Sequence, residues 1–200
     1  MALNASANIA LKNLFISKTR IKLLQVFFED PGKILYVREL VRAVSEQINA
    51  VRAELSRMEK SGMLTSEVRA NRKFYGFKRD YPFYDELARM MAKATGLGGG
   101  IIHERGKLGK IKFATLSFGY IKRRTVGPTD VDLLVVGSVV LPQLAQLVKE
   151  AEEEMAREIN YSVMTEEEFT FRKRRRDPFV VGIIEKPHVM LIGDEEEMIR

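Results

Sequence analysis

Four glycines fall within five consecutive positions near the middle of the chain, in the segment Gly96-Leu97-Gly98-Gly99-Gly100. Glycine loses more backbone entropy on ordering than any other residue, so such a cluster disfavours a regular helix or strand. Two hundred residues can form one large domain or two small ones. We expect the glycine cluster to be a linker, and it therefore favours two domains.

The apolar patterns differ on the two sides of this cluster. Before it, apolar residues recur at helical spacing, whereas after it short strand patterns alternate with a helix. The predicted helices are Thr19–Phe28, Tyr36–Val44, Ser45–Gly62, Phe83–Thr95 and Leu141–Glu158, and the predicted strands are Lys112–Phe118, Val131–Val136, Asn160–Met164 and Val189–Ile192. We expect an α+β protein of two domains. Residues 1–81 form the first domain, 82–99 a connecting helix and linker, and 100–200 a second domain with an α/β sheet.

The charge is divided unequally along the chain. Residues 1–95 carry 17 Lys and Arg against 10 Asp and Glu, a net charge of +7, whereas residues 96–200 carry 16 against 17, a net charge of −1. A basic first half is expected where that half binds a polyanion.

Several classes of protein are disfavoured by composition. The chain has no cysteine, so it has neither a disulfide framework nor a thiolate metal site. Its first residues show no basic segment before a long apolar stretch, so we expect no signal peptide. No apolar run reaches the roughly 18 residues that a membrane span needs. We expect a cytoplasmic protein that does not bind a membrane.

The helix predicted over Ser45–Gly62 has two distinct faces. Its apolar stripe consists of Ile48, Val51, Leu55 and Met58, and Ser45 stands where an N-cap is expected. The opposite side carries amide, small and basic side chains, namely Asn49, Arg52, Ala53, Ser56, Arg57 and Lys60. A helix that reads a DNA groove needs these residue types, although a solvated amphipathic helix can also carry them.

A basic hairpin is predicted directly after this helix, in the segment EVRANRKFYGF (residues 67–77). Ala70-Asn71 is the predicted tip, and Arg69, Arg72 and Lys73 surround it. Cations at the tip of such a β-ribbon can contact the phosphate backbone of DNA.

Residues 17–80 resemble the winged-helix domain of ArsR/MarR-type transcription regulators. The resemblance rests on VREL…SEQINAVRAELSRMEKSGMLTSEVRANRKFYGF, which contains the helix–turn–helix, its ending and the wing. It implies double-stranded DNA as a partner and a homodimer, with the 83–95 helix as a candidate dimer element. The implied DNA contacts are Ser45, Asn49, Arg52, Ser56, Arg57 and Lys60 in the helix region and Arg69, Asn71, Arg72 and Lys73 in the wing.

The second half contains two aspartates two positions apart, Asp130 and Asp132, at the start of the aliphatic strand predicted over Val131–Val136. Residues two apart in a strand point to the same face, so the two carboxylates would lie side by side. Such a pair can ligate Mg²⁺, and it can equally be two exposed acids at a strand edge.

The segment ATLSFGYIKRRTVGPTDVDLLVVG resembles the signature of minimal nucleotidyltransferases of the DNA polymerase beta superfamily. That signature consists of a strand, a Gly-Ser turn and then Asp-x-Asp in an aliphatic strand, and the resemblance covers residues 100–194. It implies Asp130 and Asp132 as catalytic and metal-binding residues. It also implies nucleotide contacts from Ser117, Gly119 and Lys122, with Mg²⁺ and an NTP as the ligands of an active site.

The segment departs from the family pattern at two places. Aligned from Asp130, the family's glycine falls on Phe118 and its serine on Gly119, which alters the turn that grips the triphosphate. Active members also use a third acid from the next strand. Here that strand offers Asn160 or Ser162 in its middle and Glu158 only at its edge.

Three hypotheses follow from these patterns. The first is a DNA-binding transcription regulator whose second domain is a non-catalytic, ligand-sensing or oligomerisation module. The second is a Mg²⁺-dependent nucleotidyltransferase that modifies a protein or small molecule, with the winged helix for targeting or autoregulation. The third is an interaction scaffold that uses both domains for protein contacts.

Overall fold

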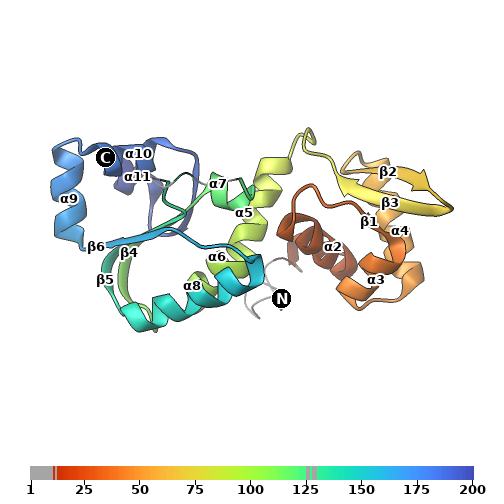
Figure 1. The fold of residues 1–200 in the computed structure, drawn as a ribbon, viewed down its shortest axis with the longest axis horizontal. Coiled ribbons are helices and arrows are strands. Elements are labelled where there is room, and N and C mark those ends of the chain that lie inside the picture. The colour runs from red at the N-terminus through yellow and green to blue at the C-terminus, as the bar shows by residue number, and fades with distance from the viewer. Residues whose placement is uncertain (1–10, 12, 125–126, 128–129) are drawn as a thin grey trace. The chain divides into compact units, whose positions relative to one another are not determined.

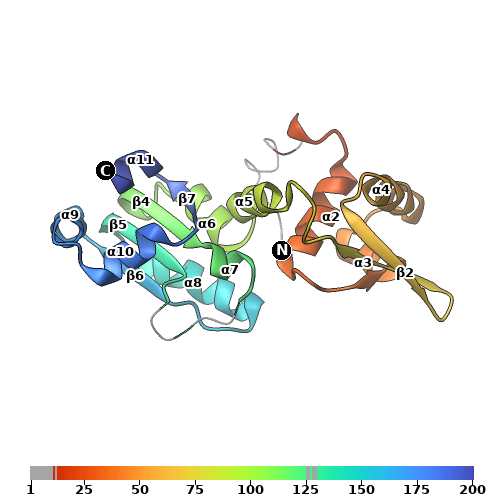
Figure 2. The same cartoon turned by 90° about the horizontal axis from the view of Figure 1, so that it is seen from above.

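The computed structural model describes residues 11, 13–124, 127 and 130–200. They form a mixed α+β structure with two separate sheets (Figures 1 and 2). The chain divides into two compact units, one ending at Met91 and the other continuing from Ala92 to Arg200. Across these described ranges, no helix is both long and apolar enough to cross a membrane.

The first unit consists of short helices and a three-stranded antiparallel sheet with the strand order β1-β3-β2. Its elements are α2 (Lys18–Glu29), β1 (Leu35–Tyr36), α3 (Val37–Val44), α4 (Ile48–Lys60), β2 (Leu64–Arg69) and β3 (Arg72–Phe77), followed by α5 (Tyr84–Ala94), in which the division between the units falls.

The helices of this unit pack through the apolar stripes that the sequence predicts. Leu24 in α2, Leu40 in α3, and Val51, Leu55 and Met58 in α4 are fully buried. Residues three or four apart lie on the same side of a helix, so each stripe faces the common core. The predicted helices and their inward faces are therefore confirmed here.

The turn between α3 and α4 differs from the prediction. Ser45 ends α3 in the left-handed conformation, with a φ of 50°, and its N–H donates to the carbonyl of Val41. α4 begins at Ile48, and its N-cap is Gln47, whose side chain makes no capping bond. The prediction that Ser45 caps α4 is wrong, because a left-handed residue is needed at this point to end α3.

The β2–β3 hairpin turns at Ala70 and Asn71, which confirms the predicted tip. Both residues have positive φ angles, of 44° and 62°. A two-residue loop with this geometry is a type I′ turn, whose twist matches that of the flanking strands.

The second unit is built on a four-stranded mixed sheet with the order β6-β5-β4-β7, in which β5 and β6 are parallel and the other pairs antiparallel. Its elements are α6 (Gly96–His103), β4 (Gly109–Ser117), α7 (Phe118–Ile121), β5 (Leu133–Val139), α8 (Leu141–Met155), β6 (Tyr161–Met164), α9 (Glu166–Arg174), α10 (Pro178–Glu185), β7 (His188–Ile192) and α11 (Glu195–Ile199).

Helices cover both faces of this sheet (Figure 1). On one face, Ile101 of α6 and Leu144 of α8 pack against Leu116 and Val135 of the sheet. On the other face, residues of α9, α10 and α11 pack against alternate sheet residues, and these are Phe169, Val180 and Met198 against Phe113, Leu134 and Val136. The strands are consequently buried on both sides, which explains their nearly continuous apolar sequence.

The glycine cluster is helical, so the prediction of a linker there is wrong. Gly96 to His103 form α6, and Gly98 and Gly99 are buried. A Cβ atom at Gly98 would lie 2.2 Å from the carbonyl oxygen of Ala92. Only glycine permits this close approach of α6 to the last turns of α5, and burial of Leu97 and Ile101 offsets its entropic cost.

The sequence patterns above do not predict α10. It begins at Pro178, and the side chain of Asp177 caps it by accepting hydrogen bonds from the N–H groups of Phe179 and Val180. An aspartate followed by a proline is a typical helix start, so the signal is present in the sequence.

Candidate functional site

The two aspartates of the second unit both precede β5, which begins at Leu133. Asp132 is anchored by its backbone: its N–H donates to the carbonyl of Asn160, and its carbonyl accepts from the N–H of Ser117. Its side chain is buried, whereas that of Asp130 is 41% exposed. The two carboxylates therefore lie in different environments, and β5 begins at Leu133, directly after Asp132, rather than at Val131 as predicted.

Asp132 forms a buried ion pair. Its Oδ1 atom lies 2.8 Å from Nη2 of Arg157, and its Oδ2 atom accepts a hydrogen bond of 3.2 Å from the N–H of Asn160. The Arg157 guanidinium also lies over the ring of Tyr120, 5.5 Å from its centroid. Burial raises the pKa of Asp132, and the charge of Arg157 opposes that rise.

Asp130 forms a second, exposed ion pair. Its Oδ1 atom accepts from the ammonium of Lys186 at 2.6 Å, and its Oδ2 atom accepts from the N–H of Gly127 at 2.9 Å. The hydrogen bond from Lys186 lowers the pKa of Asp130, and the bond from Gly127 lowers it further. Each aspartate thus has its own cationic side chain as a partner.

These residues do not fit the magnesium site that the resemblance implies. Mg²⁺ takes oxygen ligands in near-octahedral geometry, and it would have to displace both Arg157 and Lys186. In the part of the chain that the structure describes, no cluster of three or more His, Asp or Glu residues could hold a metal ion. Of the candidate third ligands, Asn160 contacts Asp132 through its backbone N–H, and Glu158 is exposed before β6.

The turn expected to hold phosphate is closed by its own hydrogen bonds. Ser117 caps α7, because its Oγ atom accepts from the N–H of Tyr120 at 3.0 Å. The N–H of Phe118 donates to the carbonyl of Pro187, and the Lys122 ammonium lies over the Phe118 ring at 4.9 Å. Among the predicted nucleotide contacts, only Ser117 lines the nearby cavity, whereas Gly119 and Lys122 do not.

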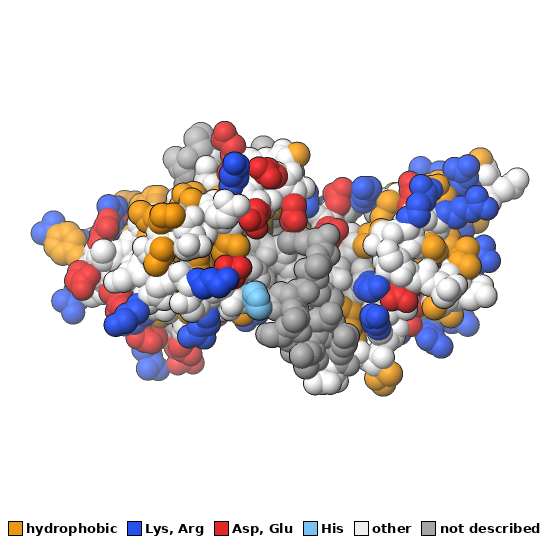
Figure 3. All heavy atoms as spheres, turned by 90° about the horizontal axis from the view of Figure 1, so that it is seen from below, with side chains coloured by type: hydrophobic (Ala, Val, Ile, Leu, Met, Phe, Trp, Pro, Cys, Tyr) orange, Lys and Arg blue, Asp and Glu red, His pale blue; other side chains and the backbone are white. Residues whose placement is uncertain are grey.

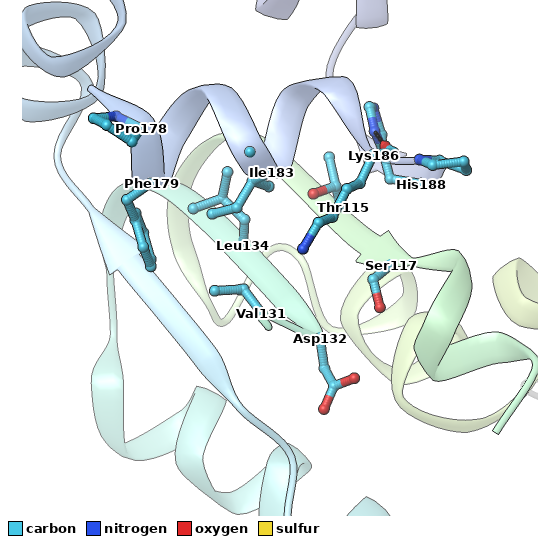
Figure 4. Close-up of a pocket in the computed structure, with 12 residues that line it drawn as sticks. Thr115, Ser117, Val131, Asp132, Leu134, Pro178, Phe179, Ile183, Lys186 and His188 are labelled. Carbon is cyan, nitrogen blue, oxygen red and sulfur yellow. Dashed lines mark hydrogen bonds between the residues drawn. The ribbon is translucent and has the colours of Figure 1, made fainter. Parts of the chain in front are cut away.

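That cavity lies between α10 and the sheet and has a volume of about 350 Å³ (Figure 4). Its sheet side is formed by alternate residues of two paired strands and the position before β5. These are Thr115, Ser117, Asp132 and Leu134. The helix side consists of Pro178, Phe179, Gly182, Ile183 and Lys186.

In the first unit, α4 presents a polar and basic exposed face. Asn49, Arg52 and Lys60 are exposed, and Ser56 is half-buried. Arg57 is also exposed, but its Nη1 atom lies 3.2 Å from Oε2 of the buried Glu54. Among the described residues, Arg52 and Lys60 make no ion pair. The structure therefore brings the predicted helix residues onto one surface, except for Ser45, which lies in the turn before α4.

The hairpin carries the remaining predicted cations. Arg69 and Arg72 face each other directly across the two strands, on either side of the tip residues Ala70 and Asn71. Lys73 lies further along β3, and its ammonium binds the carboxylate of Glu59 at 2.7 Å. This bond connects the hairpin to α4, and it lowers the pKa of Glu59 and raises that of Lys73.

Some residues of these sites were not predicted. Arg157 and Lys186 neutralise the two aspartates from distant positions, and Tyr36 lies under the guanidinium of Arg72 at 5.1 Å. Glu54 holds both Arg20 and Arg57. No periodic pattern or motif in the sequence indicates the distant partners Arg157 and Lys186. Glu54, however, is an acid on the apolar side of α4, and a buried acid needs a cationic partner.

Comparison of the whole chain with protein-family models, with curated proteins and with solved structures finds no match.

Proposed function

We propose that this protein is a DNA-binding transcription regulator, with double-stranded DNA as the partner of its first unit. The order of helices and the three-stranded sheet β1-β3-β2 support a winged-helix domain. In that architecture α4 is the recognition helix and the β2–β3 hairpin is the wing. α4 follows α3 after a three-residue turn (residues 45–47), as in a helix–turn–helix.

One observation carries this proposal. Arg69 and Arg72 lie directly opposite each other at an exposed hairpin tip, where like charges destabilise the strand pair. Glu67 pairs with Arg69, but no described acid pairs with Arg72. A phosphate between the two guanidinium groups would remove the repulsion, as expected for a wing that contacts the DNA backbone.

The charged face of α4 supports the same proposal. Its two acids point away from the exposed side: Glu54 is buried against Arg20, and Glu59 binds Lys73 and Ser66 of the hairpin. Arg52 and Lys60 consequently carry uncompensated positive charge. Figure 3 shows Lys and Arg side chains gathered over the first unit, on the right of the view. Asn49 and Ser56 add groups that can bind base edges.

The second unit is proposed to be a non-catalytic relative of nucleotidyltransferases. The two ion pairs support this part of the proposal, because Arg157 and Lys186 compete with any metal ion for Asp132 and Asp130. The enzyme hypothesis remains testable. It requires transfer of labelled nucleotide from Mg²⁺–NTP and loss of that transfer on Asp130→Asn.

A homodimer is part of the proposal because winged-helix regulators commonly read two half-sites. α5, the candidate dimer element, buries its apolar residues within the chain, since Leu87, Ala88 and Met91 are at most 7% exposed. In the predicted 83–95 helix, Phe83 remains 60% exposed and Met90 is half-buried, so a dimer through this helix would use these side chains. Light scattering on the free protein and on its DNA complex measures the oligomeric state.

The test begins with selection of bound duplexes from a random pool, followed by fluorescence anisotropy titrations over a range of salt concentrations. The Arg69→Ala/Arg72→Ala variant removes two expected phosphate contacts. The slope of log K against log salt should then become less steep by about 1.8, because each contact contributes about 0.9. Arg52→Ala/Arg57→Ala should lose the preference for the selected sequence.

Arg105→Ala/Arg174→Ala is the matched control, because it removes two exposed arginines from the second unit with the same change of net charge. It should bind the selected duplex as the unmodified protein does. Unchanged affinity and salt slope in the hairpin variant, with the fold intact by circular dichroism, would refute DNA binding through this surface.

A further inference from the structure

The helix α10 places one face over a cavity in the second unit. Pro178, Phe179, Gly182, Ile183 and Lys186 line it, and their spacing of one, three and four positions corresponds to one side of a helix. Val180 points elsewhere and is fully buried in the core. The cavity therefore has a largely apolar roof that closes over the sheet.

The floor of the cavity contains two hydroxyl groups, those of Thr115 and Ser117. Thr115 is only 2% exposed, and it lines the cavity. Ser117 Oγ accepts from Tyr120 N–H, which leaves its own proton to donate. Buried hydroxyls are normally hydrogen-bonded. The Thr115 hydroxyl and the proton of Ser117 can both donate to a polar atom in the cavity.

Lys186 brings a cationic group to the wall of the cavity. The Lys186 side chain extends from the end of α10 into the space above β4 and β5 (Figure 4). Its ammonium donates one hydrogen bond to Asp130, and its other two donors have no acceptor among the residues that the structure describes. The negative charge of Asp132, the acid on the wall, is compensated by Arg157.

We propose that this cavity binds a small organic anion, a carboxylate on a compact apolar body. The carboxylate would accept from Lys186, Thr115 and Ser117, and the apolar body would lie against Leu134, Phe179 and Ile183. A volume of about 350 Å³ lies within the usual range for small-molecule sites. The inference rests on the proposal that the second unit does not hold a magnesium nucleotide.

A nucleoside triphosphate is the competing ligand, and the cavity is poorly suited to it. One ammonium lines the wall, whereas triphosphate sites combine several cations, backbone N–H groups and a metal ion. The N–H of Phe118, next to the cavity, already donates to Pro187.

The test uses 2-naphthoate as the probe and 2-naphthamide as its uncharged isostere, titrated into the full chain by calorimetry. The chain has no tryptophan, so naphthalene fluorescence gives an independent signal. We expect 2-naphthoate to bind at least tenfold more tightly than the amide. Mg²⁺–ATP should not displace it.

Three variants test the site, and a fourth is the control. A Cβ at Gly182 meets no atom within 4 Å, so Gly182→Leu adds its side chain in open space at the cavity wall and should abolish binding. Lys186→Gln should weaken binding about tenfold, and Thr115→Val should weaken it while preserving shape. Glu185→Leu adds the same leucine to the exposed side of α10 and should bind normally.

Four outcomes would overturn the inference: no binding of 2-naphthoate, equal affinity for the acid and the amide, full binding by Gly182→Leu, or displacement by Mg²⁺–ATP. Displacement by Mg²⁺–ATP would also contradict a non-catalytic second unit, whereas the other three outcomes leave that proposal standing. None of these measurements involves DNA, so DNA binding by the first unit is judged separately.

Discussion

Arg157 lies against Asp132 with 2.8 Å between Nη2 and Oδ1, and the carboxylate is only 1% exposed. The arginine belongs to the segment between α8 and β6, and its guanidinium also covers the ring of Tyr120. Tyr120 is itself buried, and burial raises its pKa to about 12. The second unit therefore supplies a cation from its own chain to the acid that the sequence marks as a metal ligand.

Arg157→Gln should destabilise the protein by about 3 kcal/mol, because it leaves the buried Asp132 without a cation. Burial already raises the pKa of Asp132, so its ionised form disfavours the fold, and the variant should raise this pKa further. The loss should be largest at neutral pH and should diminish as the pH falls through the folded-state pKa. Urea unfolding over pH 4–8 measures it.

The double variant Arg157→Gln/Asp132→Asn is the control for this prediction. It removes both charges and should recover most of the stability. If the double variant were as unstable as the single one, the cost would come from packing rather than from charge.

Glu54→Gln should destabilise the first unit by about 2 kcal/mol, because Arg20 and Arg57 lose their shared partner. Burial tends to raise the pKa of Glu54, but hydrogen bonds from Arg20, Ser17 and Arg57 outweigh it and lower the pKa. The stabilisation is therefore present above the unfolded-state pKa and is lost as the pH falls through the folded-state pKa. The melting temperatures of the unmodified protein and the variant should converge in acid and differ at pH 7, and thermal unfolding measures them.

Ala70→Asn/Asn71→Gly should stabilise the hairpin by about 1 kcal/mol. Ala70 has a φ of 44°, which is costly for a residue with an ordinary side chain, and Asn-Gly is the preferred pair for this turn. Chemical denaturation measures the gain. Because neither change removes a cation, the salt slope of DNA binding should stay constant, and a loss of affinity at constant slope would mean that Asn71 contacts DNA directly.

Gly98→Ala should destabilise the second unit by about 3 kcal/mol, because its Cβ would lie 2.2 Å from the carbonyl oxygen of Ala92. Gly182→Ala is the matched control in another helix. It meets no atom within 4 Å and should gain about 0.5–1 kcal/mol from helix propensity. Urea unfolding measures the change in the free energy of unfolding for each variant. Changes of opposite sign would confirm that packing requires a glycine at Gly98, and changes of equal sign would contradict it.

The elements that rest on local periodicity could be predicted from the sequence. The apolar stripes of α2, α3 and α4 and the tip at Ala70-Asn71 occur where expected, because each depends on neighbours a few positions apart. The strand boundaries shifted by a few residues, and β5 begins after both aspartates. Local patterns define the ends of an element less sharply than its presence.

The errors come from interactions between distant residues. The glycine cluster forms α6 because its backbone packs closely against the end of α5, which no local property reveals. A serine at position 45 could cap the start of α4, but Ser45 instead adopts the left-handed conformation that ends α3. The residue type alone does not distinguish these two roles. Lys186 lies 56 positions from Asp130 in the sequence, so nothing in the segment around Asp130 and Asp132 predicts this ion pair.

The sheet of the second unit incorporates a strand that is made late in synthesis. β7 pairs with β4 only after α8, β6, α9 and α10 have intervened, whereas the hairpin of the first unit joins neighbouring strands. On the ribosome, residues up to Met91 can fold while the later ones are still being translated. Until residues 188–192 emerge, β4 has an unpaired edge, to which a strand of another chain can pair.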